Sequence, residues 1–204
     1  MNGMRTARRL LALAALLAVT ASCGDVARNS RSPVYLVVDS LLQGANNTIL
    51  SDVQTLVITP APCSALTPCA TIFNDMASVS MHISPKDIGV PAFGLLPSDN
   101  NQVTITRYHV TYRRADGRNT PGVDVPYGFD GAATVTVTPS GGGKITFEIV
   151  RHAAKEESPL VQLIISRTII TTIAEVTFYG TDLAGNEISA TGSITIDFGN
   201  FGDS

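Results

Sequence analysis

Apolar and polar residues alternate along most of the chain after residue 33. Around Tyr108, Val110 and Tyr112 every second residue is apolar, and the same period recurs around Phe147 and Phe178. This alternation is typical of antiparallel strands that have one face on a core and the other in solvent. It predicts nine strands, at residues 34–42, 53–59, 77–84, 103–113, 133–138, 144–150, 160–165, 174–181 and 188–198.

Turn-forming residues separate these strands, for example Pro-Ser-Gly-Gly-Gly at 139–143 and Ala-Gly-Asn at 184–186. The chain also holds 22 Thr, 18 Val and 16 Ile among its 204 residues. Their β-branched side chains fit pleated strands and are stiff in helices. Pattern and composition together exclude an all-helical protein and predict an all-β sandwich or barrel.

The charge balance excludes two further classes. The chain is 44% hydrophobic and 15% charged, with a net charge of −3, which excludes a disordered chain. Nucleic-acid binding needs clustered Lys and Arg, and the only adjacent basic pair after the N-terminal segment is Arg113-Arg114. We therefore expect no nucleic-acid partner.

The first 22 residues have the features of a secretory leader. Arg5, Arg8 and Arg9 precede an unbroken apolar run at residues 10–19, which ends in small residues before Cys23. The run has 10 residues, whereas a membrane-spanning helix needs about 20. Without this leader the chain has 11 basic and 17 acidic side chains, a net charge of −6.

The end of the leader, Thr20-Ala-Ser-Cys23, resembles the lipobox of bacterial lipoproteins. The resemblance implies that the Cys23 thiol receives a diacylglycerol and becomes an acylated N-terminus, with enough acyl chains for stable membrane attachment. Gly24 follows, and by the sorting rule of that family it favours the outer membrane. The expected organisation is a signal peptide at 1–22, a lipidated tether at 23–33 and one domain at 34–200. An ordinary signal peptide followed by an incidental cysteine is the alternative.

Two cysteines remain, Cys63 and Cys69, separated by five residues in a Pro-rich stretch. An exported protein meets an oxidising compartment, so we predict a local disulfide. A zinc site is the weaker alternative, because His82, His109 and His152 are widely scattered. A redox pair would have two residues between its cysteines.

Two segments carry a resemblance to a fold family. The pattern Tyr108-x-Val110-x-Tyr112, followed by charged residues and a turn, resembles the C strand of fibronectin type III domains. Residues 176–189 are similar to the F strand, the F–G turn and the start of strand G in those domains and in bacterial immunoglobulin-like domains. The resemblance implies a single antiparallel immunoglobulin-like β-sandwich, enlarged by long connections at 85–102 and 118–134.

Within the connection at 118–134, the loop tips around Pro121 to Gly131 are the preferred contact surface for a partner. Tyr127 and Phe129 would be apolar anchors beside Asp124 and Asp130. The alternative is that both aromatic side chains cap one end of the core. Loops of this length are either functional or decorative.

A second candidate site is the turn that holds Asp182, Asn186 and Glu187, whose oxygens could bind calcium. Asp and Asn are also ordinary turn formers through hydrogen bonds to the backbone, and we favour that interpretation. No cofactor is otherwise expected.

Residues 152–158 (His-Ala-Ala-Lys-Glu-Glu-Ser) could form a single helical turn between two strands. The adjacent Glu156 and Glu157 point in different directions on a helix or a strand, so a catalytic carboxylate pair would need a second carboxylate from elsewhere. A solvated loop is the favoured interpretation.

The chain has no Gly-x-Ser-x-Gly, Walker, His-Glu-x-x-His or dinucleotide-binding motif. We therefore expect a non-enzymatic, membrane-anchored lipoprotein that binds or scaffolds another component of the cell envelope. The alternatives are a cell-surface carbohydrate-binding module, which would need exposed aromatic platforms, and less favoured, a hydrolase.

Overall fold

The computed structural model describes residues 31–86 and 98–201, and the predicted leader, Cys23 and most of the predicted tether lie outside this part. Strands dominate it, and its only α-helix has four residues, which confirms the all-β prediction. The strands are β1 (Val34–Leu42), β2 (Thr48–Asp52), β3 (Thr55–Val57), β4 (Cys69–Thr71), β5 (Asp75–Pro85), β6 (Val103–Arg113), β7 (Phe129–Val137), β8 (Gly143–Val150), β9 (Ile170–Asp182) and β10 (Glu187–Gly199). The helices are α3 (His152–Lys155) and the 3-10 turns η2 (Asp99–Asn101) and η3 (Leu160–Ile164).

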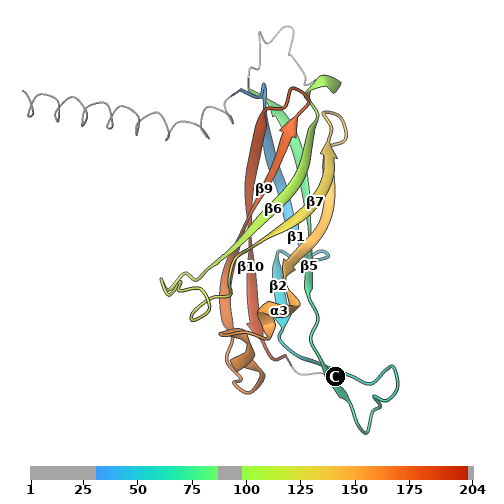
Figure 1. Cartoon of the computed structure of the whole chain (residues 1–204), viewed down its shortest axis with the longest axis vertical. Helices are drawn as coiled ribbons and strands as arrows, with labels where there is room; N and C mark the ends of the chain where they lie inside the picture. Colours follow the sequence, from blue (N-terminus) through green and yellow to red (C-terminus); the bar gives the residue numbers. More distant parts are fainter. Residues whose placement is uncertain (1–30, 87–97, 202–204) are drawn as a thin grey trace, which may run out of the picture.

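The strands form three sheets (Figure 1). One has the order β1-β5-β8, a second has the order β2-β10-β9-β6-β7, and the third is the small hairpin β3-β4. Strand β2 runs parallel to β10, whereas the other pairs are antiparallel. The hairpin projects from the end of the molecule opposite to the start of β1 (Figure 1).

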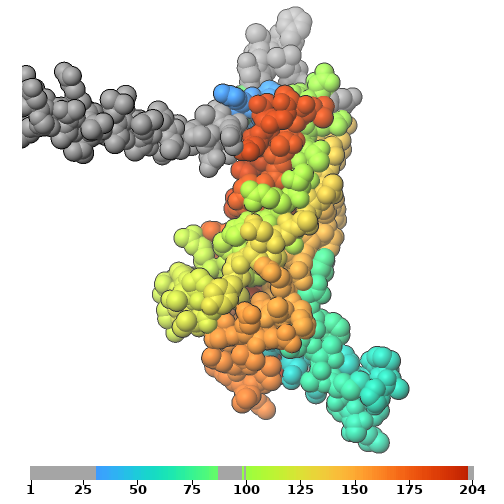
Figure 2. Space-filling view, viewed as in Figure 1, coloured from blue at the N-terminus to red at the C-terminus, as the bar shows by residue number. Residues whose placement is uncertain are grey.

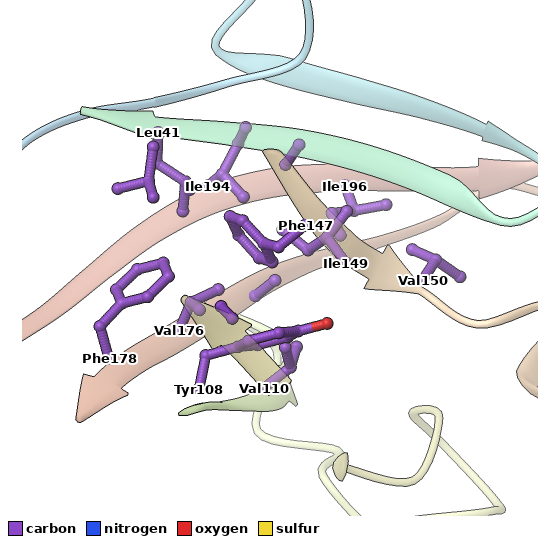
Figure 3. Close-up of a cluster of buried hydrophobic side chains, with 14 of the residues drawn as sticks. Leu41, Tyr108, Val110, Phe147, Ile149, Val150, Val176, Phe178, Ile194 and Ile196 are labelled. Atoms are coloured by element: carbon purple, nitrogen blue, oxygen red, sulfur yellow. The ribbon is translucent and has the colours of Figure 1, made fainter. Parts of the chain in front are cut away.

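The core lies between the three-stranded and the five-stranded sheet (Figure 3). The ring of Phe147 on β8 meets the rings of Tyr108 on β6 and Phe178 on β9, with centroid distances of 4.8 and 5.3 Å. The Tyr112 hydroxyl donates to the backbone oxygen of Ile149 across the two sheets, at 2.6 Å. Burial raises the pKa of Tyr112, so this hydroxyl stays protonated. Two sheets packed in this way are consistent with the predicted β-sandwich.

Most predicted strands are found close to their predicted bounds, and those at 34–42 and 103–113 match β1 and β6. The strand predicted at 160–165 is wrong, because this segment is the 3-10 turn η3. Its buried residues are Leu160 and Leu163, three positions apart, as a helical turn requires. The strand predicted at 53–59 contains only the three residues of β3, and neither β2, which ends just before it at Asp52, nor β4 was predicted. The helical turn that residues 152–158 could form is present as α3, but the favoured solvated loop is wrong for Lys155, which is buried.

The ordered fold begins slightly before residue 34. Ser32, counted in the predicted tether, is 1% exposed. Its hydroxyl accepts a weak hydrogen bond of 3.5 Å from the Val34 amide and also bonds the Asp182 carboxylate. The last residues before β1 are therefore held against the end of β9.

The Tyr112 hydrogen bond gives a direct test of the contact between the sheets. Replacing Tyr112 by Phe leaves the buried Ile149 carbonyl without this donor, so the free energy of unfolding should fall by about 1–3 kcal/mol in urea denaturation. The matched control is Tyr127→Phe, which alters an exposed ring and should change the free energy of unfolding by less than about 0.5 kcal/mol. Equal stability of the two variants would contradict the assigned role of Tyr112.

Candidate binding surface

The predicted contact residues of the 118–134 connection do not share one surface. Phe129 begins β7 and is 5% exposed, with its ring against Tyr108 and under the guanidinium of Arg151. Tyr127 is 58% exposed and lies over the backbone of Gly122. Phe129 is therefore part of the core, as the alternative interpretation expected of both rings, and of the two rings only that of Tyr127 is exposed.

The two predicted aspartates are also apart from each other. Asp124 accepts a hydrogen bond from the Thr120 amide within its own loop, at 3.2 Å. Asp130 lies on the outer face of the five-stranded sheet, 3.1 Å from His109 Nδ1 and 3.6 Å from the Arg107 guanidinium. Cross-strand pairs of this kind stabilise a sheet surface modestly.

The turn after β9 supplies hydrogen-bond donors to the carboxylate of Asp182, the last residue of that strand. Asp182 accepts hydrogen bonds from the backbone of Ala184 and from the backbone and side chain of Asn186, at 2.8–3.0 Å. Burial acts to raise the pKa of Asp182, but these bonds and the one from Ser32 outweigh it and lower the pKa. Glu187 follows as the first residue of β10. The side chain of Asp182 therefore has the turn-forming role that the sequence favoured over calcium binding.

A shallow hollow of about 300 Å³ lies on the outer face of the five-stranded sheet, beside the irregularity in β6 between Ile105 and Arg107. Arg107 covers the Tyr179 ring there, with 3.9 Å between the guanidinium carbon and the ring centroid. Elsewhere in the described residues, the exposed rings lie in three separate segments: Tyr35 in β1, Phe73 between β4 and β5, and Tyr127 between β6 and β7. These positions give no shared aromatic platform of the kind that sugar stacking uses.

Exposed apolar side chains gather instead at one end of the molecule, which we call the loop end. It is formed by residues 53–74, 114–128 and 151–169, and it lies opposite to the start of β1 (Figures 1 and 2). Of the fourteen large apolar side chains exposed in the described residues, nine belong to these three segments. They are Leu56, Ile58, Leu66, Phe73, Val123, Tyr127, Val161, Ile165 and Ile169.

Residues 53–74, which we call the arm, have an unusual composition. The arm contains no Asp, Glu, Lys, Arg or His. None of its residues from 54 to 74 is buried, so no other part of the described chain covers it. Exposed apolar surface without charges is poorly suited to water and marks interaction sites.

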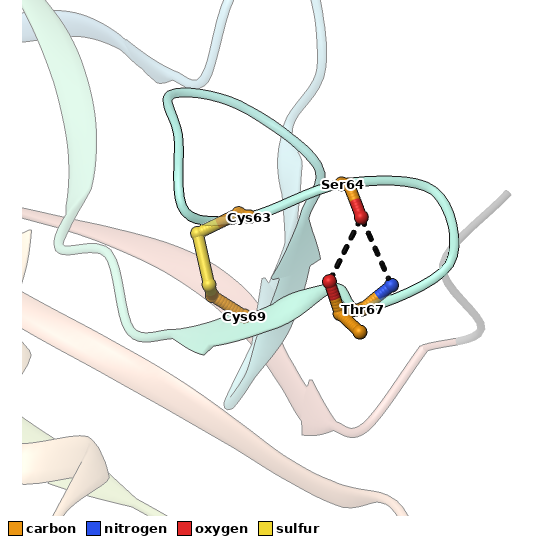
Figure 4. The surroundings of a disulfide bond; sticks show 4 residues. All are labelled: Cys63, Ser64, Thr67 and Cys69. Carbon is orange, nitrogen blue, oxygen red and sulfur yellow. Dashed lines mark hydrogen bonds between the residues drawn. A yellow bond between two sulfur atoms is a disulfide. The ribbon is translucent and has the colours of Figure 1, made fainter.

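The arm is nevertheless ordered by its own bonds (Figure 4). The predicted disulfide is confirmed: Cys63 and Cys69 are bonded, with Cα atoms 5.4 Å apart. Strands β3 and β4 pair beside it. At the tip, the Ser64 hydroxyl lies 2.8 Å from the Thr67 hydroxyl, and the two backbones exchange two hydrogen bonds. Ser64 and Thr67 therefore bond one another, and Leu66, which lies between them in the sequence, is 95% exposed.

A buried lysine contacts both of the residues that flank the arm, Asp52 before it and Asp75 after it. Lys155, at the end of α3, is 1% exposed. Its Nζ donates to the backbone oxygen of Asp52 at 2.8 Å and lies 3.0 Å from Asp75 Oδ2. The Ser51 hydroxyl donates to the same Asp75 oxygen at 2.6 Å. We call these four groups the Lys155 cluster; it fixes the residues just before and just after the arm.

The electrostatics of this cluster are those of a buried ion pair. Burial raises the pKa of Asp75, and the attraction of the Lys155 ammonium and the Ser51 hydrogen bond offset only part of that effect. Asp52 adds a second set of bonds, because its carboxylate accepts from the Thr55 hydroxyl at 2.9 Å and the Phe201 amide at 3.2 Å. The start of the arm is thereby bonded to the C-terminal end of the fold.

Sequence reasoning treated Lys155 as part of a solvated loop and did not single out the arm. The position of Lys155 depends on partners about 80 and 100 residues away, and no local pattern marks it. The arm had a usable signal, because an uncharged run of 22 residues between Asp52 and Asp75 is visible in the sequence.

The Lys155 cluster predicts a large effect of a single substitution. Lys155→Met leaves the buried Asp75 carboxylate without its cation and should lower the free energy of unfolding by about 3–5 kcal/mol. The matched control is Lys144→Met on exposed β8 surface, with an expected change below about 0.5 kcal/mol. The double variant Lys155→Met, Asp75→Asn should regain part of the loss in the same urea titration. A Lys155→Met protein with the same free energy of unfolding as the control would contradict the stabilising role assigned to the Lys155 cluster.

No protein-family model, curated protein or solved structure matches this chain. In residues 31–86 and 98–201, no helix is long and apolar enough to cross a membrane. Over the same residues, no three or more His, Cys, Asp or Glu side chains are grouped as a metal site would require.

Proposed function

We propose that this protein is a lipid-anchored component of a bacterial cell envelope, whose non-catalytic immunoglobulin-like domain binds a protein partner through the loop end. The observation that carries the proposal is the arm, an ordered and uncharged projection that no described part of its own chain covers. Keeping such a surface exposed is costly for a soluble domain unless a partner covers it.

The strand order supports the immunoglobulin-like part of the proposal. With β1, β5 and β8 taken as strands A, B and E, the three-stranded sheet has the order A-B-E. With β6, β7, β9 and β10 taken as C, C′, F and G, the larger sheet contains G-F-C-C′, as in variable-type domains. The departures are the parallel strand β2 beside β10 and the arm, both inserted between A and B.

The positions of the start of the fold and of the arm support a binding surface that lies far from the lipid anchor. Under the lipobox resemblance Cys23 attaches the chain to a membrane, and the ordered fold starts at Ser32, held near the end of β9. The arm lies at the other end of the sheets (Figure 1). Strand β9 has 13 residues, which at about 3.3 Å per residue places the two ends roughly 40 Å apart. The disulfide in the arm agrees with an oxidising compartment outside the cytoplasm.

The experiment is site-specific photo-cross-linking in intact cells, followed by separation of membrane and soluble fractions. A photoreactive residue in place of Leu66, at the tip of the arm, should give a discrete adduct in the membrane fraction. The same residue in place of Leu183, exposed at the opposite end, is the matched control and should give little adduct. With Cys23→Ala the chain should move to the soluble fraction.

Two results would contradict the proposal separately. Equal amounts of adduct at positions 66 and 183 would contradict the assignment of the loop end as the binding surface. A chain that is soluble with Cys23 intact would remove the lipid anchor.

A further inference from the structure

We propose that the Lys155 cluster is a modification site, at which the Lys155 amine and the Asp75 carboxyl condense into an amide that links α3 to the start of β5. The ion pair in the structure is the state before this reaction. The reaction takes place within one chain and needs no partner at the loop end, so it is independent of the proposed function.

The two reacting groups already lie at contact distance. Lys155 Nζ is 3.0 Å from Asp75 Oδ2. A carbon–oxygen bond of about 1.2 Å joins that oxygen to the carboxyl carbon, so Nζ lies within about 4.2 Å of the carbon that it attacks. Reacting atoms in near-attack geometries are about 3–3.5 Å apart. A shift of about 1 Å or less therefore brings the amine to reacting distance.

The surroundings of the pair favour condensation. The Lys155 side chain is 1% exposed and that of Asp75 13%, so little water reaches the bond that forms. Two buried charges lose hydration that their mutual attraction repays only in part, whereas the amide that replaces them is neutral. Burial also raises the pKa of Asp75, which favours the protonated carboxyl that the reaction consumes.

The step balances within the pair. One proton moves from the Lys155 ammonium to Asp75 Oδ2, which gives a neutral amine and a neutral carboxyl. The amine lone pair forms the Nζ–Cγ bond, a second amine proton passes to Oδ2, and the Cγ–Oδ2 bond breaks to release one water molecule. One ammonium and one carboxylate thus become one amide and one water, with no change of net charge and no oxidation or reduction.

The other two members of the cluster are placed to assist. The Ser51 hydroxyl donates to Asp75 Oδ2, the oxygen that leaves, at 2.6 Å and stabilises the charge that develops on it. The Asp52 backbone oxygen accepts from Lys155 Nζ at 2.8 Å and so orients the amine. The amide keeps one N–H on the same nitrogen, for which the Asp52 oxygen remains the acceptor. The product therefore leaves this buried N–H with a partner.

The amide has a direct consequence for the arm. Asp75 is the residue at which the arm returns to the body, so the bond makes that attachment covalent. A force on the arm then acts on a bond to α3 and not on an ion pair. The link also closes a long loop, which restricts the unfolded chain.

The intact mass of the denatured chain tests the proposal. The parent chain is purified from the cells that produce it, together with Lys155→Arg and the matched control Lys144→Arg, which lies on exposed β8 surface. An arginine at position 155 keeps the cation but has no amine that condenses. Lys155→Arg should therefore be heavier than Lys144→Arg by the mass of one water molecule.

Peptide mapping of the parent locates the bond and does not depend on the folding of any variant. Trypsin cleaves after Lys155 only when its amine is free. After reduction of the disulfide, the parent should give a branched peptide that joins residues 32–86 to residues 152–167. Fragmentation of this peptide should place the link between Asp75 and Lys155.

Three results separate the two proposals. Equal masses of the two Arg variants, with free cleavage of the parent after Lys155, would overturn the amide and leave the proposed function intact. A loss of water at another position, such as a cyclic imide at Asp116-Gly117, would also leave Lys155 cleavable and overturn the amide. A branched peptide without a cross-linked adduct at position 66 would support the amide and contradict the proposed function.

Discussion

Lys155 contacts Asp52 and Asp75, the two residues that flank the arm, and the position of the arm at the loop end depends on this interaction. A lysine that is 1% exposed is tolerated only when its charge is paired and its donors are bonded, and here Asp75 and the Asp52 carbonyl provide both. Because Asp52 and Asp75 bound the arm, the same cation fixes where the arm leaves the body and where it returns. The interaction joins β2, β5 and α3, which are distant in sequence.

The fold is stabilised mainly by the core between the sheets, whereas the proposed binding surface is on the arm. The core between the two sheets is made of apolar side chains from β1, β2, β5 to β10 and η3, and of the arm only Val53, its first residue, belongs to it. The arm is ordered by its disulfide, a short strand pair and bonds within its own tip. An insertion held in this way can keep apolar side chains in solvent without loosening the fold, which is the property that a binding projection needs.

The sequence predicted the features whose cause is local. Alternation identified β1 and β6 to the residue, because buried and more exposed positions alternate on both sides of the one irregularity in each strand, at Val38/Ser40 in β1 and at Ile105/Arg107 in β6. The short spacing of Cys63 and Cys69, together with the export expected from the leader, was enough to predict their disulfide. Where neighbours in space decide the structure, prediction failed: the apolar run at 160–165 resembles a strand, yet it folds as η3 with Leu160 and Leu163 buried.

The candidate site was predicted only in part. Of the predicted contact residues, Tyr127 is exposed at the loop end, whereas Phe129 is in the core and Asp130 is on a sheet face. Tyr127 and Phe129 are two positions apart, and β7 begins at Phe129. The local sequence does not show which of the two rings faces solvent at such a strand start. The burial of Lys155 depends on pairing between strands and a helix far along the chain, so it could not be predicted from the seven residues around it.

The central claim is that the arm is a rigid projection held by the Lys155 cluster and not a flexible loop. Backbone ¹⁵N relaxation of the folded protein measures this directly. The account predicts order parameters for residues 54–74 near the value of about 0.85 found in rigid backbone. It also predicts that Lys155→Met lowers them selectively, while β6 and β9 keep their values. Order parameters below about 0.6 along the arm of the unaltered protein would contradict the account.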